Sequence, residues 1–298
     1  KLEYTFKNDT LFKMLFVKNP DLLKRLVAEL LGVKHGSIGK FAITNPEMPP
    51  EAIGDKFCRL DVNMTVDGQR VDLEIQVRDE NDFPERTLFH WAREYSTSLG
   101  EGDAYSELPR VVIISIVAFR MFDCQECHSE FQALEVTRHV PLTDRLSLQY
   151  YELPKLPKAV SADNALELWL KLFDADTEEE LRQIEELGVP IMQQAIGAYR
   201  SVTATEEFRT LERMRSDARR NEASALANAR REAAEEADAK WRGVVAEKDA
   251  ALVEKDAALV EKDAALVEKD AALVEKDAAL VEKEAEIARL RAMLQEGK

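Results

Sequence analysis

Apolar positions recur every three or four residues in several stretches of the first 200 residues, which is the spacing of one face of an α-helix. The first such stretch is residues 8–17, with Asn8 or Asp9 as its predicted N-cap. An Asn or Asp side chain in that place accepts a hydrogen bond from an unpaired backbone N–H group of the first turn. Pattern and boundary residues predict further helices over residues 20–31, 84–99, 162–173 and 177–199.

Other stretches have the alternation or the unbroken apolar run that is typical of β-strands. Residues 57–66 and 70–77 predict two strands joined by a tight turn at Asp67-Gly68, which is a strong hairpin signal. Residues 110–119 are almost all apolar, as in a central strand that is buried on both faces. Weaker patterns predict strands over residues 131–136 and 146–153. Together, these helices and strands predict a mixed α/β fold for the first part of the chain.

The last third of the chain has a different pattern, because the heptad DAALVEK occurs five times without change from Asp249 to Lys283. On a helix, the Val and Ala residues form a seam spaced by four and three, with Val at heptad position d and Ala at position a. Asp and Glu flank this seam, so pairing with an identical helix sets acid against acid. The pattern predicts either a weak or partner-dependent coiled coil, or a marginal helical tail that grew through slippage of a repeated DNA unit.

The chain has 298 residues and a formal net charge of −16. Residues 202–298 hold 18 basic and 23 acidic side chains, so most of the net negative charge lies before them. This acidity argues against a protein that binds nucleic acid through a general positive surface, although it leaves room for a small local site. There is no run of 18 apolar residues, no apolar secretory segment at the start and no disulfide framework among the three cysteines. We therefore expect a cytoplasmic protein.

The candidate chemistry lies in the predicted hairpin. In its second strand, Glu74 and Gln76 point away from the core, because side chains alternate along a strand. The first strand carries Asp61 near its start, and the hairpin can bring it beside Glu74. These two carboxylates and the backbone carbonyl of Ile75 would form a cluster of hard oxygens that suits Mg²⁺ or Mn²⁺. Gln76 would then lie next to the metal, where it could orient a water or a phosphate oxygen. The simpler alternative is a polar face of a sheet.

This arrangement resembles the core of the PD-(D/E)XK nucleases, in which an Asp on one strand and a (D/E)-x-K on the next hold the metal and position the nucleophilic water. Asp61 and Glu74-Ile75-Gln76 match those positions, with Gln in place of the Lys. The opening DTLFKMLF at residues 9–16 is similar to the D-x-x-F-K-x-x-F start of one branch. So are the helix over residues 86–95, the Gly102…Tyr105 loop and the apolar strand over residues 111–118. That branch is the PD-(D/E)XK nuclease family transposase group, also called the recombination-promoting nuclease family.

The resemblance covers roughly residues 3–160. It implies a restriction-endonuclease-like domain over residues 1–160, with a central mixed sheet flanked by helices. A helical extension over residues 161–201 and a charged helical tail over residues 202–298 would follow it. The resemblance further implies a Mg²⁺- or Mn²⁺-dependent DNA endonuclease of the kind found in mobile-element-like genes of bacteria. DNA is thus the expected partner, together with a second copy or another helix on the tail, and no membrane.

By position, the resemblance makes Asp61 and Glu74 metal ligands and sets Gln76 in the place of the family's Lys. A neutral Gln can donate and accept hydrogen bonds but cannot supply the positive charge of a Lys. That charge has to come from a second metal, Arg78 or Arg86, or the site is slow. The alternative is therefore a catalytically inactive interaction protein that has a nuclease fold and assembles through its tail.

Four further features have competing interpretations. Asp9 matches an acidic residue near the active site of this branch, and is either a further metal ligand or only an N-cap. Arg86 either contacts DNA phosphate or forms a structural ion pair with a nearby acid. The motif CQECH at residues 124–128 has the pattern of covalent haem attachment, but without an export signal an ordinary loop is expected. The arginines between residues 209 and 220 could contact phosphates, although the acids among them favour an ion-paired, solvated helix.

Overall fold

The computed structural model of the chain describes residues 1–45, 62–159 and 161–296. The chain divides into two compact units, Lys1–Glu222 and Ala223–Lys298. The boundaries that the sequence suggests at residues 160 and 201 both fall inside the first unit. None of the helices in the described part of the chain combines the length and the apolar character that a membrane span requires.

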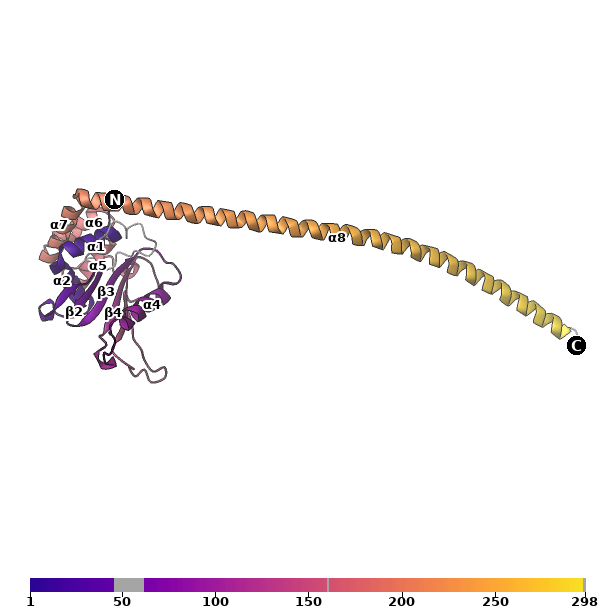
Figure 1. Cartoon of the computed structure of the whole chain (residues 1–298), viewed down its shortest axis with the longest axis horizontal. Coiled ribbons are helices and arrows are strands. Elements are labelled where there is room, and N and C mark those ends of the chain that lie inside the picture. The colour runs from indigo at the N-terminus through magenta and orange to yellow at the C-terminus, as the bar shows by residue number, and fades with distance from the viewer. Residues whose placement is uncertain (46–61, 160, 297–298) are drawn as a thin grey trace. The chain divides into compact units, whose positions relative to one another are not determined.

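A six-stranded mixed sheet forms the middle of the first unit, in the order β1-β2-β3-β4-β6-β5 (Figure 1). Strands β1, β2 and β3 are antiparallel neighbours, β3, β4 and β6 run parallel, and β5 is antiparallel to β6. Every residue of β4 is buried, which confirms the central strand that its apolar run predicts. The strands in chain order are Phe41–Ile43, Val62–Val66, Gln69–Gln76, Val111–Val117, His128–Phe131 and Leu146–Glu152.

The turn between β2 and β3 confirms the hairpin that Asp67-Gly68 predicts. Asp67 has a φ of 49° and Gly68 a φ of 85°, and two-residue hairpin turns need such positive values to match the twist of their strands. The Asp67 carboxylate accepts hydrogen bonds from the backbone N–H groups of Gly39 (3.0 Å) and Lys40 (2.7 Å). The turn therefore ties down the start of β1, a strand that the sequence pattern does not predict.

Helices cover both faces of the sheet (Figure 1). Helices α1, α2, α5, α6 and α7 form one layer, and their apolar side chains share a core with alternate strand residues such as Val112 and Ile114. Helix α4 packs on the other face, where Phe83 meets Val111 and Tyr150 in a smaller cluster. The helices of the two layers are Asp9–Lys18, Pro20–Leu30, Ala165–Asp174, Glu178–Glu186 and Pro190–Thr203 on the first face, and Phe83–Ser96 on the second.

Two of the predicted elements are wrong in part. The predicted helix over residues 177–199 is two helices, because Gly188, with a φ of 70°, ends α6 and Pro190 begins α7. The predicted strand over residues 131–136 is shifted: β5 ends at Phe131, and the chain continues as a loop. The apolar residues of that loop are exposed, so their alternation does not come from a sheet face.

Helix α8 covers Glu206–Glu296 and confirms the helical tail. Its first turns belong to the first unit, where Phe208 is fully buried and packs edge-on against Tyr4 with 4.9 Å between ring centroids. In the second unit, the Leu and Val side chains of the five repeats are 55–70% exposed. Pairing of this helix with another one stays a prediction.

Candidate active site

The polar face of β3 points toward α4. Glu74 is only 4% exposed there, and it lies opposite Ser115 of β4 in the strand register. The Ser115 hydroxyl donates a hydrogen bond of 2.9 Å to Glu74 Oε1. A buried carboxylate needs such a donor, because burial without a partner is costly. Sequence reasoning missed this contact, although Ser115 is visible as the one polar interruption of the apolar run.

Asp61 lies outside the described residues. It is joined directly to Val62, the first residue of β2, and Val62 pairs with Leu73, the neighbour of Glu74. The Ile75 carbonyl faces the edge of β3 that lies beside β2. The backbone N–H of Arg70 and the carbonyl of Gln76 form hydrogen bonds of 2.9 Å at the opposite edge, beside β4. Backbone groups alternate between the two edges of a strand, so those of Ile75, next to Gln76, point toward β2.

The side-chain amide of Gln76 is held at both ends. Its Oε1 accepts a hydrogen bond of 2.9 Å from Arg86 Nη2, and its Nε2 donates one of 2.6 Å to the carbonyl of Arg78. Arg86 also pairs with the carboxylate of Glu80 through Nη1. The structure thus gives Arg86 an ion pair, as one of its two interpretations expects, with an acid that the sequence did not single out. The same guanidinium reaches the Gln that stands in the place of the family's Lys.

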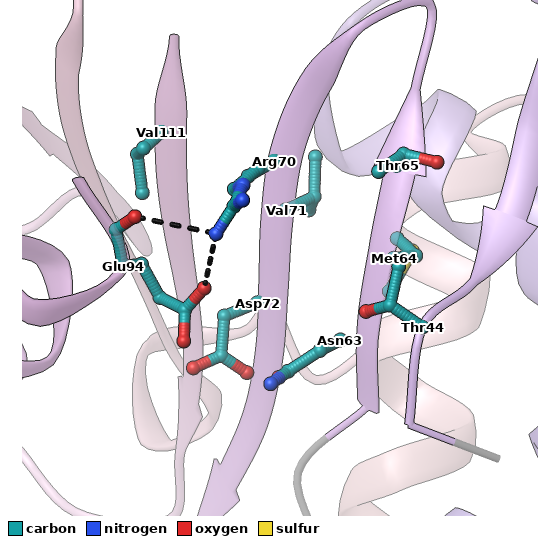
Figure 2. Close-up of a pocket in the computed structure, with 9 residues that line it drawn as sticks. All are labelled: Thr44, Asn63, Met64, Thr65, Arg70, Val71, Asp72, Glu94 and Val111. Atoms are coloured by element: carbon teal, nitrogen blue, oxygen red, sulfur yellow. Dashed lines mark hydrogen bonds and ion pairs between the residues drawn. The ribbon is translucent and has the colours of Figure 1, made fainter. Parts of the chain in front are cut away.

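A cavity of about 180 Å³ lies beside this face, between β1–β3 and the end of α4 (Figure 2). Its polar wall includes Asp72, which is 8% exposed and lies beside Asn63 in the strand register. Arg70 spans it and donates to both the carboxylate (3.3 Å) and the carbonyl (3.4 Å) of Glu94. Asp72 lies two positions before Glu74 on the same face of β3. The cavity therefore extends the polar surface of β3 from Glu74 toward the start of the strand.

Asp9 has a different role from the N-cap that the sequence allows. Asn8 is the cap of α1, since its side chain accepts a hydrogen bond of 2.8 Å from the N–H of Leu11. Asp9 is the first helical residue, and its carboxylate pairs with Arg215 (2.8 Å) and Arg219 (2.5 Å) of α8. Burial raises the pKa of Asp9, but the two arginines outweigh it and hold the pKa below its ordinary value. Asp9 therefore fastens the first helix to the base of the last one.

The residues present fit a hard divalent cation. Within the described ranges there is no group of three or more His, Cys, Asp or Glu side chains that could hold a metal by themselves. The described residues do supply the Glu74 carboxylate and the Ile75 carbonyl. These are oxygen donors that Mg²⁺ and Mn²⁺ prefer, together with several waters. The hydrogen bond from Ser115 is of the kind that orients a metal-binding carboxylate. A site of this composition would need one more carboxylate.

The CQECH motif lies in a loop that leads into β5, as its simpler interpretation expects. Below it, Lys155 and Glu152 form a buried ion pair of 2.5 Å, and Lys155 also donates to the sulfur of Cys124 at 3.2 Å. Burial raises the pKa of the Cys127 thiol to about 11. The Lys155 contact with Cys124 attaches the loop to the end of β6.

A mixed sheet with helices on both faces, and a buried acid on the second strand of a hairpin, is consistent with the PD-(D/E)XK class of fold. The family model of the PD-(D/E)XK nuclease family transposases matches residues 6–229. The chain therefore belongs to this family. The matched region includes α5–α7 and the base of α8, which carries both arginines that bind Asp9. No curated protein and no solved structure matches the chain.

Proposed function

We propose that this chain is a metal-dependent endodeoxyribonuclease that hydrolyses phosphodiester bonds. The observation that carries the proposal is the buried Glu74, held by Ser115 and followed two residues later by the fixed amide of Gln76. A buried carboxylate is stabilised by hydrogen-bond donors or by a metal ion. Membership of a nuclease family gives the burial of Glu74 beside Gln76 a chemical purpose.

Three donors would hold the ion, Mg²⁺ or Mn²⁺. They are Glu74, the Ile75 carbonyl and Asp61, the residue that leads into β2 beside Leu73. When bound, such an ion lowers the pKa of a water and offsets charge on the phosphate. Gln76 has one N–H and one lone pair left after its two hydrogen bonds, with which it can orient that water or a phosphate oxygen.

The acidic composition sets the mode of DNA binding. With a net charge of −16, the chain has no general attraction for a polyanion, so contact depends on a few basic side chains near the site, such as Arg78. Binding that releases few counterions is weak and yields to moderate salt. A metal at Glu74 would add local positive charge to this narrow surface.

The tail supplies the second kind of contact. Its Val and Ala seam is exposed over five repeats, and an apolar stripe of that length on a helix usually faces another helix. A second copy on this seam would set two nuclease units on one assembly, where they could cut both DNA strands, whereas a different helical partner would attach the nuclease unit to another protein.

The test is a plasmid-nicking assay with Mg²⁺, Mn²⁺ or EDTA. We expect the unchanged chain to nick supercoiled DNA with either metal and to stop in EDTA. Asp61→Ala and Glu74→Ala should each lower the rate by at least about 100-fold, because each removes a charged metal ligand. Asp144→Ala is the matched control, since it removes a carboxylate whose side chain is 90% exposed.

Activity that persists in both ligand variants would show that the assigned site is wrong. A folded chain without activity in any metal would support the other hypothesis, a nuclease-fold protein that binds partners without catalysis.

A further inference from the structure

The neighbours of Gln76 fix the direction of its amide. Arg86 can only donate hydrogen bonds and the Arg78 carbonyl can only accept them, so one orientation satisfies both. In that orientation Oε1 meets Arg86 at 2.9 Å and Nε2 meets the carbonyl at 2.6 Å. A surface glutamine rotates among several rotamers, whereas this one is held at both ends.

The connection between β3 and α4 explains how Arg86 reaches Gln76 from ten residues away. Asn81 adopts a φ of 60°, and its N–H bonds to the Asp79 carboxylate at 3.0 Å. This tight turn folds the first residues of α4 back over the end of β3. Within α4, Arg86 Cζ lies 4.7 Å from the centroid of the Phe83 ring, which is three residues earlier on the same face of the helix.

Arg86 is well placed to act electrostatically. Its side chain is 14% exposed, so water screens its charge less than that of a surface arginine. Glu80, which is 53% exposed, is its one ion-pair partner within the described residues. A phosphate that approaches the site would repel Glu80 and leave the guanidinium to face the new negative charge.

We propose that Arg86 is a positioning residue that holds the amide of Gln76 and supplies the positive charge that Lys gives at this position in other PD-(D/E)XK sites. The proposal rests on the nuclease function proposed above. It divides the work of one lysine between two residues: the amide gives the directed hydrogen bond, and the guanidinium behind it gives the charge. A hydrogen bond to a charged donor also polarises the amide and makes its remaining N–H a stronger donor.

A double-mutant cycle on the full-length chain tests the coupling. Arg86→Ala should lower kcat by about 10- to 100-fold and change KM by less than about threefold, since a charge-assisted contact in the site is being removed. In a Gln76→Ala chain the same change should lower kcat by a clearly smaller factor, because the amide that Arg86 holds is gone and only the loss of its charge remains. Arg86→Lys should recover part of the loss.

Two further measurements separate this role from a merely structural one. Gln76→Lys should restore an Arg86→Ala chain to within about tenfold of the unchanged protein. The side-chain amide signal of Gln76 in a ¹⁵N NMR spectrum, assigned with Gln76→Ala, should shift in Arg86→Ala without metal or DNA. Arg93→Ala is the matched control, because it removes an exposed arginine from the same helix.

Equal losses from Arg86→Ala with and without the Gln76 amide would overturn the positioning role. A Gln76→Lys/Arg86→Ala chain that stays inactive would overturn the charge substitution. These results differ from failure of the nuclease assignment, in which the unchanged chain is inactive or ignores the loss of Asp61 and Glu74. In that case both proposals fall.

Discussion

Asp9 links the two ends of the first unit through a single carboxylate. Both of its oxygens are engaged, one by Arg215 at 2.8 Å and the other by Arg219 at 2.5 Å. Its side chain is 25% exposed, so solvent weakens but does not cancel these attractions. The contact opposes a role in metal binding, because the two positive guanidinium groups repel a cation that approaches the same carboxylate.

Asp9→Asn should therefore lower the free energy of unfolding by about 1–2 kcal/mol at pH 6. The folded-state pKa of Asp9 lies below its ordinary value of 3.8. Its contribution is thus complete above that value and is lost as the pH falls through the lower folded-state pKa. Urea unfolding, followed by tryptophan fluorescence at pH 6, 4.5 and 3.5, should show a difference between the two chains that shrinks below about pH 4.

Asp144→Asn serves as the control, since the Asp144 side chain is 90% exposed. This substitution should leave the free energy of unfolding unchanged in the same measurements. A cost of Asp9→Asn that stayed constant down to pH 3 would mean that shape, not charge, makes this contact.

Single residues differ in how far the sequence reveals them. Glu74 and Gln76 follow from strand alternation and a resemblance to known nucleases. Ser115 interrupts an apolar run, so its position is visible, but only the register of β3 against β4 sets it opposite Glu74. The contact of Arg86 with Gln76 depends on the turn at Asn81, which a pattern of hydrophobic positions does not encode.

Among the elements, turns decide where the pattern succeeds. Asp67-Gly68 predicts its hairpin correctly because only a few residue pairs adopt two successive positive φ values. The break between α6 and α7 is missed, although Gly188 and Pro190 carry the usual signals for an end and a start. Continuous helical spacing on both sides of the break makes the two helices look like one.

Two glycine substitutions, one in a turn and one inside a helix, test whether the backbone conformation decides the effect on stability. Gly68→Ala should lower the free energy of unfolding by about 1 kcal/mol, because Gly68 has a φ of 85° that strains any residue with a Cβ atom. Gly197→Ala, inside α7, should raise it by about 0.5–1 kcal/mol, since a Cβ there meets no atom within 4 Å. Urea unfolding of both variants measures the two signs, and equal signs would contradict the backbone argument.

At the scale of the whole molecule, the chain separates an acidic body from a repeated helix. The composition changes at about residue 201, whereas the two compact units meet after Glu222. Composition does not show that the first turns of α8 complete the core. Phe208 of α8 completes the core of the first unit, although it follows the last glycine and the last proline of that unit. A boundary drawn where the composition changes therefore lies before this buried residue.

Two truncations should separate the contribution of the first turns of α8 to the core from the role of the repeats in assembly. A chain that ends after Ala229 keeps Phe208 and both arginines, so its urea midpoint should match that of the full chain. One that ends after Ala204 loses them and should be destabilised by about 3–5 kcal/mol, the usual cost of removing a buried aromatic side chain. Sedimentation should show a larger assembly for the full chain than for the first truncation. A monomer in both would contradict pairing of the tail with itself.

The contact between Asp9 and Arg219 also has a consequence for synthesis. A ribosome makes Asp9 more than 200 residues before its partner, so the Asp9 carboxylate lacks both arginines until the base of α8 has emerged. The 76 residues of the second unit are translated afterwards, which takes about 4–15 s at 5–20 residues per second. During that interval the first unit can close while it is still tethered. The length of the repeated helix therefore sets how much time the first unit has to join its first and last helices before the seam of the repeats is complete.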